Sequence, residues 1–156
     1  MKFDRIAREA FGSVLGPLGF SCSESKACTF YKKVGTELYH FVMPDQLSGQ
    51  EKYDIKVFFH SPLLEPTAWN DKFPDTLGIP TDSWSYLSSR TGVGPRQELF
   101  WCRTEEGFMR NFESKVKPAL LQFVAPYFDS IQTLEEAIPL IKSRHYVAVA
   151  STLNAN

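Results

Sequence analysis

The sequence has few of the residues that build disulfide frameworks and metal sites. Three cysteines and three histidines are spread over 156 residues, and no two cysteines have the CxxC spacing. An odd number of cysteines without a close pair argues against a disulfide framework. We therefore expect Cys22, Cys28 and Cys102 to be buried free thiols in a reducing compartment.

Clusters of charge of one sign are also missing. The chain has 17 basic and 18 acidic residues, a formal net charge of -1, and Lys32-Lys33 is its only adjacent basic pair. Affinity for phosphate groups comes from clustered Lys and Arg, so nucleic acid and acidic lipid are disfavoured as partners.

Long hydrophobic runs are absent as well. No run approaches the ~18 apolar residues that cross a bilayer, and residues 1–16 mix charges where a secretory signal would be apolar. These absences favour a cytoplasmic protein that does not bind membranes.

Aromatic residues, by contrast, are abundant. The chain has 13 Phe, 6 Tyr and 3 Trp, with 43% hydrophobic and 22% charged residues overall. Aromatic side chains bury a large area each, and this length suits one domain. The sequence predicts a single domain over residues 1–156.

The order of hydrophobic patterns predicts the fold class. A helical pattern covers 3–18, strand patterns cover 28–34, 37–43, 53–60 and 97–103, and helical patterns follow at 104–127 and after Thr133. Strands that follow one another without alternating helices indicate an α+β fold. We expect two layers, with an antiparallel sheet of four to five strands and the N-terminal and C-terminal helices packed on one face.

The helix predicted over 104–127 has the longest pattern in the chain. Thr104 is expected to cap it, and its apolar stripe is expected to include Met109 and Phe123. Pro118 lacks a backbone donor and clashes with the carbonyl of Ser114, which predicts a kink there.

The strands also suggest a pocket. With the larger apolar sets facing the helices, the second sheet face would carry His40, Phe58 and His60 among other residues. A pocket there, lined by these three residues, would suit a small enzyme or a small-ligand binder.

Metal and catalytic arrangements have weak support. His40 and His60 with Cys22 or Cys28 could be drawn as a zinc site, but no close-spaced ligand pair exists. Cys28 or Cys102 with a histidine lacks any local nucleophile motif. The sequence therefore predicts no metal and no cofactor, and disfavours an enzyme.

The segment 61–95 contains five of the ten prolines and little periodicity. Two explanations account for the apolar second sheet face: this segment folds back over it, which we favour, or a partner covers it. Loops this long in a compact domain are usually functional or disordered. Trp, Tyr and Arg dominate binding hot spots. The predicted contact set for a protein partner is Trp69, Asp71, Lys72, Trp84, Tyr86 and Arg90.

Three short motifs give the chain a resemblance to a known family. Leu18-Gly19-Phe20 ends the first helix, FYKK follows at Phe30 to Lys33, and YFDSIQTLEEAI runs from Tyr127 to Ile138. This order resembles the bacterial family named domain of unknown function 4304. The resemblance implies a small α+β protein without an assigned reaction, and similar proteins often serve as immunity or accessory factors of toxin systems. We therefore expect a non-enzymatic protein-binding domain.

Overall fold

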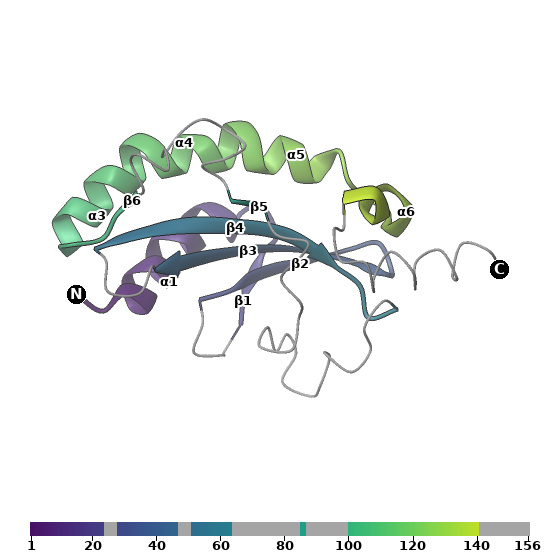
Figure 1. Ribbon diagram of the computed structural model, residues 1–156, viewed down its shortest axis with the longest axis horizontal. Coiled ribbons are helices and arrows are strands. Elements are labelled where there is room, and N and C mark those ends of the chain that lie inside the picture. Colours follow the sequence, from purple (N-terminus) through teal and green to yellow (C-terminus); the bar gives the residue numbers. More distant parts are fainter. Residues whose placement is uncertain (24–27, 47–50, 64–84, 87–99, 141–156) are drawn as a thin grey trace.

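The computed structural model describes residues 1–23, 28–46, 51–63, 85–86 and 100–140, except for the side chains of Ser85, Tyr86 and Trp101. The predicted α+β fold is confirmed: an antiparallel sheet forms one layer and the helices form the other (Figure 1). No helix in these ranges combines the length and apolar character that crossing a membrane requires.

The sheet is built on three long strands in the middle of the chain. Its order is β1-β2-β3-β4-β5, and β6 pairs with β4 further along the same edge. Gly35, with φ 64°, opens the predicted turn between β2 and β3. Three strands of two residues each, β1, β5 and β6, bring the described strands to six. Their bounds are β1 Ser21–Cys22, β2 Phe30–Val34, β3 Leu38–Gln46, β4 Lys52–His60, β5 Ser85–Tyr86 and β6 Phe100–Trp101.

The first helix, α1 (Phe3–Leu15), packs on the same sheet face as the long C-terminal helix. Phe11 of α1 lies 5.1 Å from Phe112 of the long helix, measured between ring centroids. Tyr53 of β4 lies between the helices, 5.1 Å from Phe3 and 5.4 Å from Phe108. These aromatic contacts join both helices to the sheet in one core.

The long helix runs from Glu105 to Asp129 and arcs over the sheet (Figure 1). The Thr104 hydroxyl caps it as predicted, accepting from the Gly107 backbone N–H at 3.0 Å. The helix alternates α-helical and π-helical turns: α3 Glu105–Asn111, a π turn Phe112–Val116, α4 Lys117–Ala119, a π turn Leu120–Val124 and α5 Ala125–Asp129.

Each π-helical turn ends two residues before a proline. The Lys117 N–H bonds to the carbonyl of Phe112, five residues back, and Pro118 follows. The Ala125 N–H bonds in the same way to Leu120, and Pro126 follows. A proline leaves the carbonyl four residues back without a donor, and the wider turn accommodates this. The expected kink at Pro118 therefore takes the form of a π-helical turn within a continuous helix.

The π turns also explain which side chains of the long helix are buried. A uniform α-helix turns about 100° per residue, so residues four apart are displaced by about 40° beyond one full turn. Over five such steps the displacement would reach about 200° around the helix axis. Wider turns take up this excess and keep one row facing the core. The row is Phe108, Phe112, Val116, Leu120, Val124 and Phe128, all buried.

Two residues of the predicted stripe lie on the exposed side instead. Met109 is 37% exposed and Phe123 is 46% exposed. Both fit the stripe of an ordinary α-helix, but neither belongs to the row spaced by four. The prediction that they face the core is wrong because it assumed a uniform helical period.

The last described helix begins at the predicted capping box. Thr133 Oγ1 accepts from the Glu136 backbone N–H at 3.2 Å, and the Gln132 N–H donates to Glu136 Oε1 at 3.4 Å. These bonds satisfy donors that the first helical turn leaves open. The helix consists of α6 (Leu134–Ala137) and a 3₁₀ turn, Ile138–Leu140.

The second sheet face has a smaller apolar cluster. Phe41 and Phe58 stack with ring centroids 4.8 Å apart, and both are fully buried. Nearby on β4, the Lys56 ammonium pairs with Asp45 at 2.8 Å. The predicted cover for this face, segment 61–95, lies mostly outside the described residues.

Candidate functional site

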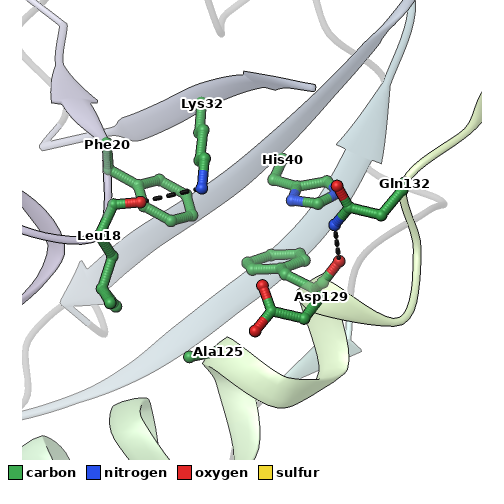
Figure 2. Close-up of a pocket in the computed structure, with 8 residues that line it drawn as sticks. Leu18, Phe20, Lys32, His40, Ala125, Asp129 and Gln132 are labelled. Atoms are coloured by element: carbon green, nitrogen blue, oxygen red, sulfur yellow. Dashed lines mark hydrogen bonds between the residues drawn. The ribbon is translucent and has the colours of Figure 1, made fainter. Parts of the chain in front are cut away.

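A recess opens where the end of α1, strands β2 and β3, and the end of the long helix meet. Its volume is about 90 Å³. We call it the Lys32 recess (Figure 2). Eight residues line it: Leu18, Phe20, Lys32, His40, Ala125, Phe128, Asp129 and Gln132.

The Lys32 side chain is held by the loop that ends α1. Its Nζ donates to the Leu18 carbonyl at 2.9 Å and lies 5.9 Å from the centre of the Phe20 ring. Gly19 shapes this loop with φ 96°, a conformation that favours glycine. A Cβ added at Gly19 would lie 3.2 Å from Lys32 Cε. The turn thus gives the lysine stem room to lie against the loop.

His40 sits beside Lys32 on the next strand, since the two residues are register partners. Its Nε2 lies 2.6 Å from the Ile131 carbonyl. A carbonyl oxygen only accepts, so Nε2 carries the proton. The ring also stacks on Phe128, with centroids 4.4 Å and planes 12° apart. His40 therefore joins the sheet to the segment that follows α5.

Burial dominates the ionisation of His40. Desolvation lowers its pKa to about 4, although the Ile131 hydrogen bond acts in the opposite direction. Lys32 lowers this pKa further and Asp129 raises it. At neutral pH the imidazole is therefore uncharged, and Lys32 supplies the positive charge of the recess.

The end of the long helix forms the opposite wall. Asp129 is exposed, and Figure 2 shows its carboxylate projecting from α5 toward the recess. The Gln132 amide group donates to the Phe128 carbonyl at 3.0 Å. The recess therefore presents an ammonium from the sheet and a carboxylate from the helix, between aromatic side chains.

The recess holds neither an imidazole base with a pKa near the ambient pH nor a hydroxyl or thiol nucleophile. A general base works best with a pKa near the ambient pH, whereas His40 is far below it and its Nε2 proton is engaged. None of the eight lining residues is a serine, threonine or cysteine. Across the part of the chain that the structure describes, no three His, Cys, Asp or Glu side chains gather into a metal-binding group.

The structure separates the three residues of the predicted pocket. His40 opposes Phe59 of β4, which faces the helices, whereas Phe58 and His60 point to the other side. The prediction that all three line one pocket is wrong. The side of β3 that carries His40 was expected to face away from the helices, but it faces them. The same separation rules out a zinc site that uses both His40 and His60.

Of the predicted partner contacts, Trp69, Asp71, Lys72, Trp84 and Arg90 lie outside the described residues, and only the backbone of Tyr86 is described, in β5 opposite Lys56.

Most of the lining residues were not predicted from the sequence. Lys32, Asp129 and Gln132 were not singled out, although each lies within or beside a motif that was. A lysine in the FYKK strand that faces inward, near the left-handed turn at Gly19, was the available signal.

Comparison of the chain with protein-family models, with curated proteins and with solved structures gave no match. The resemblance to domain of unknown function 4304 stays a prediction.

Proposed function

We propose that the protein is a non-enzymatic protein-binding domain and that the Lys32 recess receives one short polar side chain of the partner. The volume of about 90 Å³ is the observation that carries this proposal. Pockets for drug-sized ligands and cofactors have about 300–1,000 Å³. A recess this small suits a few water molecules or the end of one side chain.

The charges of the recess favour a group with both an acceptor and a donor. The Lys32 ammonium has three donors and gives one to Leu18. Across the recess, the Asp129 carboxylate accepts hydrogen bonds and repels anions. A side-chain carboxamide, as in asparagine or glutamine, matches both walls, with its oxygen toward Lys32 and its amide nitrogen toward Asp129.

The helix beside the recess adds apolar surface. Leu121 is 45% exposed and precedes the lining residue Ala125 by four positions, which places it one turn away on the same side. An exposed leucine beside a polar recess resembles the mixed apolar and polar make-up of protein interfaces. The immunity or accessory role remains part of the proposal and is supported by the family resemblance.

NMR titration of the full chain tests the recess. The probes are capped asparagine, capped aspartate and acetamide. Capped asparagine should shift the amide signals of Lys32, His40 and Gln132, and capped aspartate should bind several-fold more weakly because of Asp129. Lys32→Met should abolish the shifts. Lys33→Met is the matched control, since Lys33 is exposed and points to the other sheet face.

The outcomes separate the alternatives. Tighter binding of capped asparagine than of acetamide favours a peptide partner, whereas equal binding favours a free small amide. No saturable shift with any probe, or unchanged binding in Lys32→Met, would refute the proposal for the recess.

Capture from cell extract tests the partner. Leu121→Ser should reduce recovery of a captured protein, whereas Met109→Ser should not. Met109 is also exposed but lies 12 residues away, about 18 Å along the helix. Trp69→Ala and Trp84→Ala extend the same assay to the predicted loop contacts. Equal recovery with Leu121→Ser and Met109→Ser would argue against a partner at this end of the helix.

A further inference from the structure

Two cysteines lie on the same side of the sheet edge. Cys22 of β1 is the register partner of Phe30 in β2, and the Ser23 backbone N–H extends the ladder by donating to the Thr29 carbonyl at 2.8 Å. Side chains alternate between faces along a strand. Cys28, two residues before Phe30, therefore points to the same side as Cys22.

Helix α1 places a guanidinium group over this pair. Arg8 Nη1 lies 3.1 Å from Cys22 Sγ and also donates to the Ser23 carbonyl at 2.6 Å. The second bond holds the guanidinium in place beside the sulfur. A fixed cation next to a cysteine favours the thiolate, which is the nucleophilic form.

The two thiols differ in ionisation. The hydrogen bond from Cys28 and the charge of Arg8 outweigh burial and lower the pKa of Cys22 to about 7. The same hydrogen bond, together with burial, raises the pKa of Cys28. At neutral pH, Cys22 is thus substantially ionised while Cys28 keeps its proton.

The two thiols also differ in access. Cys22 is half-buried on the short edge strand, whereas Cys28 is 1% exposed within the core. An accessible thiolate beside a shielded thiol is the arrangement of an attacking and a resolving cysteine. Cys102 offers a contrast, because it is buried and burial raises its pKa.

We propose that Cys22 and Cys28 form a reversible dithiol–disulfide pair that reacts with low-molecular-weight disulfides through Cys22. The Cys22 thiolate attacks the disulfide, forms a mixed disulfide and releases one thiolate. Cys28 then loses its proton to solvent and attacks Cys22 Sγ, which forms the intramolecular disulfide and releases the second thiolate. Two protein thiols are oxidised and one small disulfide is reduced to two thiols. This proposal does not depend on the proposed binding function.

Peptide mapping of the full chain tests the pair. The reduced protein is exposed to glutathione disulfide near pH 7 and then digested with trypsin, which cuts after Lys26 between the two cysteines. Peptide 9–26 should be linked to peptide 27–32, with a mass lower by two hydrogens, and dithiothreitol should reverse the link. Cys28→Ser should stop at the mixed disulfide on Cys22, and Cys102→Ser should change nothing.

The role of Arg8 is tested by the pH dependence of the rate. Arg8→Met should slow the reaction of Cys22 several-fold near pH 7 and much less near pH 10, where the thiolate forms without help. Arg8→Lys should retain most of the rate. Arg5→Met is the matched control, because Arg5 lies on the same helix but pairs with Glu9 and Glu105.

Circular dichroism and thermal unfolding show whether each variant is folded. Absence of the linked peptide, reaction of Cys102 as fast as Cys22, or an unchanged rate in folded Arg8→Met would overturn the proposal.

Discussion

Acidification should destabilise this protein through His40 in a defined pH window. Desolvation holds the pKa of His40 at about 4 in the folded chain, whereas an unfolded histidine has a pKa near 6.5. Between these two values the unfolded chain binds the extra proton and the folded chain does not. The contribution of His40 to the free energy of unfolding is therefore fully present above about pH 6.5 and falls as the pH drops toward about 4.

The size of the loss follows from the width of the window. Each pH unit within it costs up to about 1.4 kcal/mol, so the whole window removes roughly 3 kcal/mol. His40 is only 2% exposed, so solvent screening is small. A loss of this size is a large share of the 5–15 kcal/mol by which domains are typically stable.

Urea unfolding at a series of pH values, compared with His40→Gln, isolates this contribution. Glutamine retains an amide donor for Ile131 but has no proton to titrate and no ring to stack on Phe128. We expect the wild type to be more stable at pH 7.5 and this advantage to shrink steadily down to pH 4. His60→Gln is the matched control, since His60 is also buried but faces the other side of the sheet.

NMR titration of the His40 ring gives an independent measurement. Lys32→Met should raise its midpoint and Asp129→Asn should lower it, because the two charges act on His40 with opposite signs. A His40 midpoint near 6.5, or a stability difference from His40→Gln that does not vary with pH, would refute the reasoning.

Three further substitutions test the structure by urea unfolding. Gly19→Ala should cost about 1–2 kcal/mol, because φ 96° strains an L-residue and the new Cβ would crowd Lys32; no loss would show that this turn relaxes freely. Tyr53→Phe should stabilise the protein by about 1 kcal/mol, because the buried Tyr53 hydroxyl has no hydrogen-bond partner among the described residues; a clear loss of stability would indicate a bound partner for that oxygen. Thr104→Ala should cost about 1 kcal/mol through loss of the cap on Gly107, whereas the neighbouring exposed Arg103→Ala should cost little.

The fold class could be predicted because the local signals agree with the global arrangement. The alternation of Tyr53, Ile55, Val57 and Phe59 identified both β4 and its helix-facing side. The caps at Thr104 and Thr133 are chemical signals that do not depend on tertiary packing. Such signals can be recognised from the residue types and their spacing alone.

The facing of β3 could not be predicted in the same way. Both of its sides are apolar, with Tyr39, Phe41 and Met43 on one and Leu38, His40 and Val42 on the other. Pairing with β4 decides between them, and a change of register by one residue would exchange the two sides. The misplacement of His40 followed from this ambiguity, and the recess was missed with it.

The recess and the thiol pair depend on contacts between distant segments. Lys32 and Asp129 belong to elements almost 100 residues apart in the sequence, and Arg8 reaches Cys22 from another element. No local pattern carries such pairings. They became visible only once the sheet register and the course of the long helix were known.

The two π-helical turns set how the chain tolerates changes of length. Deleting one residue from Phe112–Val116 would convert the π-helical turn into an α-helical turn, and the residues that follow would keep their orientation. Deleting a second residue would rotate those residues by about 100° around the helix axis. Phe128 would then leave the His40 ring, and Asp129 would turn away from Lys32, although every lining residue was still present. Deletions and insertions in this helix can therefore alter the Lys32 recess even when they lie one or more turns away from it. The wall that the long helix contributes to the recess depends on residue count as well as on residue identity.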